Sequence, residues 1–252
     1  MPPTLRLATR SCLLVLLTFC SFAAFCIGMV VAWPFGLRLD WRDRVIHWWA
    51  RTALQVMRVR VHRTGPIPAG GCLLVTNHLS YLDILVLASL RPLSFLSKSE
   101  VAQWPVIGFM ARMVNVRFLV RQDKRSLPKV AAAMASELDA GHGVTFFPEG
   151  TSSGGDEVLP FRPALLAIAA ERSIPVHYAT LRYETPPGCP LAKTCVCWWG
   201  NMTFLPHLAG LLRLPSVRAA IRFGEEPVTA TDRKQLATRL HQRVAAGLLT
   251  LR

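Results

Sequence analysis

Acidic residues are scarce in this chain. It carries 15 Asp and Glu against 29 Lys and Arg, which gives a formal net charge of +14, and only 17% of its residues are charged. A positive charge of this size calls for an acidic partner, such as nucleic acid, anionic lipid or an acidic soluble molecule. The basic residues form no dense run, and neither zinc-finger spacing nor an aromatic RNA-binding signature occurs. We therefore expect an anionic membrane surface and a phosphorylated substrate rather than nucleic acid.

Several metal-binding and catalytic signatures are also missing. The seven cysteines form no pair of C-x-x-C units, and no histidine stands at zinc-finger spacing from the late cysteines, so the sequence predicts free thiols in a reducing compartment and no metal site. No dinucleotide or P-loop fingerprint is present. No G-x-S-x-G elbow surrounds Ser80, which argues against a serine hydrolase.

The first long apolar segment, residues 12–33, predicts a membrane anchor. Its 22 residues carry no charge, and a helix of that length reaches about 33 Å, enough to cross a bilayer core. Arg6 and Arg10 precede it as in a signal peptide, but the run is too long for one and no clear A-x-A site follows. The sequence leaves open whether this helix crosses the bilayer fully or enters one leaflet.

A second helix is expected over residues 37–57, after Pro34 and Gly36. Its tryptophans recur at helical spacing against arginines, which suits a helix in the headgroup layer; the alternative is a helix that packs on the globular domain. The arginines after the first helix favour a cytoplasmic catalytic domain by the positive-inside tendency. We divide the chain into a membrane anchor with an interfacial helix, residues 1–58, and a globular domain, residues 59–252.

From about residue 60, short apolar runs alternate with helical patterns. This alternation predicts an α/β fold with a central, mostly parallel mixed sheet flanked by helices, behind N-terminal membrane-embedded helices. The expected strands are residues 72–76, 116–120, 144–147 and 174–181, with two further candidates at 195–199 and 217–223. The expected helices are residues 126–140, 163–171 and 232–249.

A histidine and an aspartate follow the first of these strands. His78 and Asp83 are five residues apart, so they cannot share one face of a helix. If they meet, His78 lies in the turn before the helix and folds back onto its first residues. A carboxylate on one imidazole nitrogen leaves the other as a proton acceptor, which lets a neutral histidine activate a substrate hydroxyl. The alternative is that Asp83 only caps the helix, since Ser80 to Asp83 is also a capping-box pattern.

A second polar segment, residues 146–155, follows another expected strand. It combines Glu149 with glycines and small hydroxylated residues, which suit a pocket for a polyol or a phosphate because backbone N–H groups can point at an anion there.

The two segments together resemble the glycerolipid acyltransferase family, whose best-known members are the 1-acylglycerol-3-phosphate acyltransferases. The similarity lies in Asn77-His78-(four residues)-Asp83 and the later Phe147-Pro148-Glu149-Gly150-Thr151, and it covers roughly residues 60–225. The resemblance implies that His78 is the general base and Asp83 its partner. It also implies that Glu149, Gly150 and Thr151 contribute to the acceptor site.

A further block of the family is similar to the segments that begin at Lys98 and end at Arg121. The resemblance implies a phosphate contact for Arg121, and Lys98 is a second candidate for that role. Two positions depart from the family pattern: Val120 stands where an acidic residue is usual, and Ser152 stands where an arginine often follows the Gly-Thr pair. Residues 149–162 and 199–208 look more like a bacterial branch that contains lyso-ornithine lipid acyltransferases.

The implied activity is transfer of a fatty acyl group from acyl-CoA or acyl-carrier protein, as co-substrate, to the free hydroxyl of a lysolipid in the membrane. The expected acceptor is 1-acylglycerol-3-phosphate, giving phosphatidic acid, with lyso-ornithine lipid as the alternative. A basic surface would attract an acidic carrier protein or the phosphates of CoA. No cofactor is expected. The expected location is the bacterial inner membrane, with the catalytic domain facing the cytoplasm. Two rival functions are a non-catalytic lipid-binding relative and a hydrolase that uses water in place of the lipid alcohol.

Overall fold

A seven-stranded sheet forms the centre of the protein in a computed structural model, which describes residues 2–36, 38–98, 116–119 and 126–251. The strand order is β1-β7-β6-β2-β5-β3-β4, and neighbouring strands run parallel except β6 and β7. The predicted mostly parallel mixed sheet is therefore confirmed. The strands are β1 (Val59–Thr64), β2 (Leu73–Thr76), β3 (Ser94–Lys98), β4 (Val116–Leu119), β5 (Val144–Phe146), β6 (Val176–Glu184) and β7 (Val217–Phe223).

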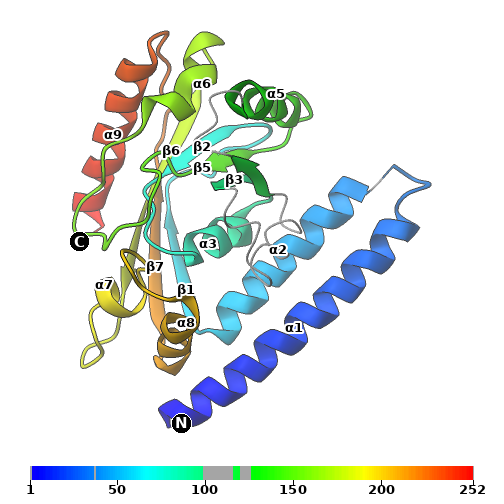
Figure 1. The fold of residues 1–252 in the computed structure, drawn as a ribbon, viewed down its shortest axis with the longest axis vertical. Helices are drawn as coiled ribbons and strands as arrows, with labels where there is room; N and C mark the ends of the chain where they lie inside the picture. Colours follow the sequence, from blue (N-terminus) through cyan, green and yellow to red (C-terminus); the bar gives the residue numbers. More distant parts are fainter. Residues whose placement is uncertain (1, 37, 99–115, 120–125, 252) are drawn as a thin grey trace.

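Helices cover both faces of this sheet (Figure 1). On one side lie α2 (Arg38–Val56), α3 (Leu82–Leu90) and α8 (Phe204–Arg213), with α1 (Pro3–Val31) outside them. On the other side lie α5 (Ser126–Asp139), the short α6 (Ala167–Glu171) with the 3-10 helix η2 (Pro163–Leu166) before it, and α9 (Arg233–Thr250). A short α7 (Ala192–Cys195) lies in the connection between β6 and α8.

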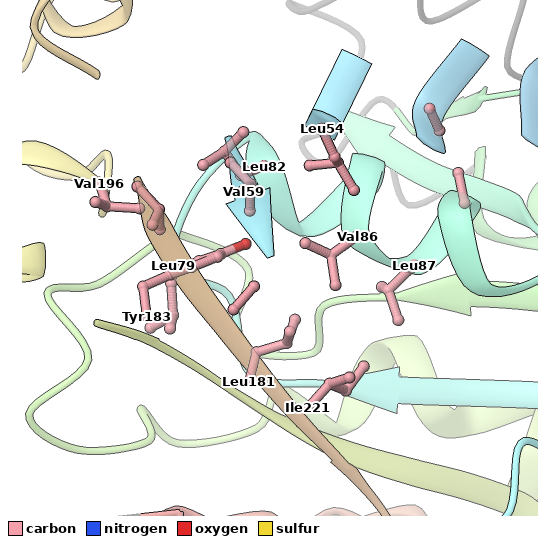
Figure 2. Close-up of a cluster of buried hydrophobic side chains, with 14 of the residues drawn as sticks. Leu54, Val59, Leu79, Leu82, Val86, Leu87, Leu181, Tyr183, Val196 and Ile221 are labelled. Atoms are coloured by element: carbon pink, nitrogen blue, oxygen red, sulfur yellow. The ribbon is translucent and has the colours of Figure 1, made fainter. Parts of the chain in front are cut away.

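Alternation along β6 divides the hydrophobic core between the two faces, because successive side chains of a strand point to opposite sides. Leu181 and Tyr183 belong to the cluster shared with α2 and α3, and Figure 2 shows Leu181 facing Val86 and Leu87 of α3. Thr180 points the other way, where its hydroxyl donates to the Val244 carbonyl of α9 at 2.8 Å. Both faces of the middle of the sheet are thus covered, as its parallel strands require.

The two N-terminal helices form an antiparallel hairpin against the domain (Figure 1). Trp41 Nε1 donates to the Ala24 carbonyl at 3.2 Å, and Trp49 Nε1 donates to Thr18 Oγ1 at 3.2 Å. The opposite side of α2 is buried in the core shared with α3. Two tryptophans of α2 therefore contact α1. In this structure α2 packs on the domain, which was the alternative interpretation of its sequence.

One predicted strand is wrong. Residues 195–199 continue the end of α7 and a turn, and the Val196 and Cys197 N–H groups both donate to the Ala192 carbonyl at 2.9 and 2.8 Å. Both residues are buried because the turn packs against the loop after β2, where the Trp198 N–H donates to the Leu79 carbonyl at 2.8 Å. The apolar run reflects burial in a loop rather than pairing in the sheet.

Candidate active site

The two polar segments meet because β2 and β5 are parallel neighbours whose carboxyl ends lie at the same edge of the sheet. Asn77, the first residue after β2, fixes the start of its loop. Its side-chain amide donates to the Leu181 carbonyl at 2.9 Å and accepts from the Leu181 N–H at 2.7 Å. The amide thereby continues the pairing with β6 where β2 ends, and it places His78 at the rim of the sheet.

His78 and Asp83 are in direct contact. His78 Nδ1 lies 2.8 Å from Asp83 Oδ2, and the same oxygen accepts the N–H groups of Leu79 at 2.7 Å and Ser80 at 3.1 Å. The carboxylate therefore fixes the turn before α3 and orients the imidazole at the same time. Because a carboxylate only accepts, Nδ1 carries the proton and Nε2 is left as an acceptor. The Asp83 side chain is 0% exposed and that of His78 is 22% exposed, so the imidazole alone reaches outward.

Tyr183 completes the surroundings of the aspartate. Its hydroxyl donates to Asp83 Oδ1 at 2.8 Å. Burial raises the pKa of Tyr183 well above its usual value, and the neighbouring Asp83 charge raises it further, so the phenol stays a donor. Nothing in the sequence pointed to this residue, because it lies 100 positions from Asp83 in an ordinary strand pattern.

The imidazole also stacks on Phe147. The two ring centroids are 4.0 Å apart and the planes differ by 12°. With the ring face covered by Phe147 and Nδ1 held by Asp83, the imidazole has one fixed orientation. Phe147 belongs to the motif that carried the family resemblance, but its contact with His78 was not predicted.

Glu149 joins the two loops through the backbone. Its Oε1 accepts the His78 N–H at 3.0 Å, and the residue is 2% exposed. Burial raises the pKa of Glu149 to about 8, and the Asp83 charge adds to this, while backbone N–H groups of His78 and Leu159 act in the opposite direction. The neutral acid is therefore favoured at pH 7. His78, Asp83 and Glu149 thus form one site, as the sequence predicted.

The other expected site residues differ in their placement. Gly150 is buried beside Glu149 with φ of 77°, a left-handed conformation that favours glycine, whereas Thr151 is exposed. Lys98 ends β3 at the same edge of the sheet, but its side chain lies outside the described residues. Arg121 and Val120 lie outside the described residues altogether. The phosphate contacts expected of Lys98 and Arg121 stay predictions.

A second histidine, His207, forms hydrogen bonds that hold the loop that carries His78. His207 Nε2 donates to the Cys197 carbonyl at 3.0 Å, so its Nδ1 is free to accept from the Tyr81 hydroxyl at 3.1 Å. Burial lowers the pKa of His207, which keeps the ring neutral for this arrangement. His207 thus joins α8 to the loop that carries His78 and to Cys197. In the described part of the chain, no three His, Cys, Asp or Glu side chains lie close enough to hold a metal ion.

Comparisons with known proteins agree with this geometry. Residues 58–181 match the family model described as Acyltransferase. The lyso-ornithine lipid O-acyltransferase of Brucella abortus is 35% identical over 225 residues, which cover 84% of this chain and 84% of that protein. The chain belongs to the acyltransferase family.

Other members of the acyltransferase family are similar over most of the chain. The 1-acyl-sn-glycerol-3-phosphate acyltransferase of Neisseria meningitidis is 28% identical, over 81% of each chain. The crystal structure of the 1-acyl-sn-glycerophosphate (LPA) acyltransferase PlsC from Thermotoga maritima has a TM-score of 0.63 at 22% identity, covering 96% of this chain and 97% of that one, which shows a shared fold. The chain is therefore a lysolipid acyltransferase, and its apolar α1 is consistent with membrane association.

Proposed function

We propose that this enzyme transfers a fatty acyl group from the thioester of acyl-CoA or acyl-carrier protein to the free hydroxyl of a lyso-ornithine lipid. The observation that carries the chemistry is the fixed orientation of His78, with Nδ1 donating to Asp83 at 2.8 Å and Nε2 left as an acceptor. Such an imidazole can accept the proton of an alcohol that lies beside it. No protein nucleophile is required, because the lipid alcohol itself attacks the thioester.

In the reaction, the lipid hydroxyl oxygen forms a bond to the thioester carbonyl carbon while its proton passes to His78 Nε2. The resulting tetrahedral oxyanion collapses, the C–S bond breaks, and the thiolate takes the proton back from His78. The products are the ester and the free thiol of the carrier. The buried Asp83 stabilises the imidazolium that exists between the two proton transfers.

The lyso-ornithine acceptor is supported by the relatives and by Ser152. Four relatives that are 31% to 35% identical are lyso-ornithine lipid O-acyltransferases, whereas the two Neisseria phosphate-acceptor enzymes are 28% identical. By the family resemblance, Ser152 stands where an arginine often follows the Gly-Thr pair, and its hydroxyl donates to the Trp198 carbonyl. The position therefore stabilises a neighbouring loop and provides no cation for a phosphate monoester.

The second candidate acceptor is 1-acylglycerol-3-phosphate. It is favoured by the similarity to the Neisseria enzymes and by the phosphate contacts expected of Arg121 and Lys98. We also propose that the enzyme lies on the inner membrane with its catalytic domain facing the cytoplasm, since α1 is apolar and arginines follow it in α2.

The purified enzyme is tested with lyso-ornithine lipid and lysophosphatidic acid in competition, with an acyl thioester as donor and mass spectrometry of the lipids. We expect ornithine lipid as the main product and a loss of about 10²- to 10⁴-fold in kcat for His78→Ala. Full activity of the His78→Ala variant would overturn the assignment of the base. Free fatty acid without diacylated product would identify a hydrolase, and no turnover by folded protein would identify a lipid-binding relative.

A further inference from the structure

Three strands at one edge of the sheet place a block of basic side chains on a single face. Residues paired in register on neighbouring strands point to the same side of a sheet. Across β1, β7 and β6 the three rows of this block are Arg60–Arg218–Glu184, His62–Ala220–Arg182 and Thr64–Arg222–Thr180. We call the surface formed by Arg60, His62, Arg182, Arg218 and Arg222 the basic face.

The basic face is exposed and carries a net positive charge. Arg60, Arg218 and Arg222 are exposed, and the side chain of Arg218 is 55% exposed. The one acidic member of the block is Glu184, which pairs with Arg218 at 3.1 Å and with Arg182 at 3.7 Å. One carboxylate against four guanidinium groups leaves the surface strongly basic. These arginines have no role in the site at His78.

The basic face points away from the N-terminal helices. Thr180, which belongs to the same block, bonds to Val244 of α9, so α9 and the basic face share one side of the sheet. Leu181 and Tyr183 point to the other side, where α2 and α3 pack and α1 lies outside them (Figure 1). A bilayer that holds α1 therefore lies across the sheet from these arginines. This placement favours a soluble partner over a lipid surface.

The basic face also lies at the active-site end of its strand. Arg182 and Glu184 flank Tyr183 on β6, and Tyr183 bonds to Asp83. The arginines and the His78–Asp83 pair therefore lie near the same end of β6, on opposite faces of the sheet. A partner that docks here is close to the reaction that it supplies.

We propose that the basic face docks an acidic acyl-carrier protein that presents the acyl thioester. The inference rests on the proposed acyl transfer, which requires a thioester donor, and on charge complementarity between the arginines and an acidic carrier surface. Complementary charge steers association and selects partners, and arginine is enriched where proteins bind one another. Because the guanidinium groups are exposed, the interaction weakens as salt concentration rises.

The test compares two donors on the full-length enzyme in lipid vesicles. The double variant Arg60→Glu/Arg218→Glu reverses two neighbouring charges in one row of the basic face. We expect its KM for acyl-carrier-protein thioester to rise about ten-fold or more, while its KM for acyl-CoA and both kcat values stay within about two-fold. The matched control is Arg172→Glu/Arg233→Glu, which makes the same charge change at exposed positions near the opposite end of β6 and should leave both KM values unchanged.

A direct titration of the enzyme with acyl-carrier protein measures docking apart from turnover. We expect a Kd that rises in the Arg60→Glu/Arg218→Glu variant and not in the control. Equal KM effects on both donors, an unchanged Kd, or use of acyl-CoA alone by the unsubstituted enzyme would each overturn carrier docking. A loss of binding to anionic vesicles would assign the face to lipid and also overturn it. Failure of the unsubstituted enzyme with both donors counts against the proposed function, whereas the titration still decides the docking.

Discussion

At the scale of single residues, the buried Asp83 is the centre of the site. Its two oxygens accept from the His78 imidazole, the N–H groups of Leu79 and Ser80, and the Tyr183 hydroxyl. A buried carboxylate is costly unless it is fully hydrogen-bonded. These donors therefore stabilise the charge that orients His78, and in the proposed reaction Leu79, Ser80 and Tyr183 act through Asp83 without contacting the substrate.

Tyr183 is the donor that can be removed with least disturbance. The Tyr183→Phe variant leaves Asp83 Oδ1 buried and without its hydrogen bond, at a cost of about 1–3 kcal/mol. We expect kcat to fall about ten-fold, since about 1.4 kcal/mol corresponds to a factor of ten. KM for the lysolipid should stay the same because Tyr183 is buried beneath the site. Steady-state kinetics across a pH series measures both quantities.

Tyr178 provides the matched control for this prediction. It lies on the same strand, β6, but packs in the cluster with α9 on the other face of the sheet. The Tyr178→Phe variant should keep its kcat. Equal losses in the two variants would mean that Tyr183 acts only through general stability.

The sequence predicted the central pair of the site but not its supports. His78 and Asp83 are close in the chain, so their spacing predicted that the histidine lies before the helix if the two meet, and the structure shows that they do. Tyr183 and His207 lie 100 and 126 positions from their partners Asp83 and Tyr81. Contacts between such distant residues depend on strand order and helix packing, which local patterns do not contain.

At the scale of elements, Arg10 joins α1 to the end of α8. Its guanidinium donates to the carbonyls of Leu212 at 3.0 Å, Leu214 at 2.6 Å and Pro215 at 3.1 Å. The last carbonyls of a helix have no hydrogen-bond partners within the helix. A positive charge is also stabilised there, because the C-terminal end of the helix dipole is negative. Arg10 therefore caps α8, and α8 in turn carries His207, which bonds to Tyr81 just after His78 in the chain.

Removing this cap should loosen the N-terminal helix from the domain. We expect the Arg10→Ala variant to lose about 2–4 kcal/mol in free energy of unfolding, because three carbonyls lose a charged donor in a buried place. Thermal unfolding in mild detergent and limited proteolysis between α8 and β7 measure the effect. Arg44 is exposed on α2, so the Arg44→Ala variant is the control, and matching transitions in the two variants would contradict the role of Arg10.

The strands β1 and β3 were not predicted, and burial explains why the first of them was missed. β2 and β5 are continuous buried runs in the middle of the sheet, and β6 is fully buried at 179–181, so their apolar sequence reveals them. β1 is an edge strand in which Val59 and Val61 alternate with exposed polar residues, and it was not predicted. The Cys197 region was predicted as a strand because it is apolar and short, and its burial in a loop gives the same pattern.

At the scale of the whole molecule, the position of α1 constrains how the enzyme meets the bilayer. α1 is long and apolar enough to cross a membrane by length and composition. However, α1 is held at two places: Arg10 bonds to the end of α8, and the Ala24 carbonyl accepts from Trp41 of α2. If α1 crossed the bilayer with these contacts intact, it would draw α2 into the hydrocarbon, including the charged Asp43 and Arg44 close to Trp41. Placing one charged side chain at the centre of a bilayer costs about 2.5–3.5 kcal/mol.

The same contacts leave one long side of α1 uncovered. Leu13, Leu16 and Phe19 are exposed on it, so a helix lying along the membrane surface can bury this side in one leaflet while Arg10 stays bonded to α8. In that arrangement the N-terminal end of α1 and the turn after it lie on the same side of the bilayer. That side is also the one that holds the catalytic domain.

Thiol labelling of sealed vesicles distinguishes the two arrangements. Single cysteines are introduced by Thr4→Cys, Phe35→Cys and Thr231→Cys, at exposed positions in the first turn of α1, after α1 and on the domain. The background is an active enzyme whose seven native cysteines are replaced by alanine. We expect a membrane-impermeant maleimide to modify all three from the same side. Modification of Thr4→Cys and Phe35→Cys from opposite sides would show that α1 crosses the bilayer, and the bond between Arg10 and α8 could then not persist in the membrane-bound enzyme.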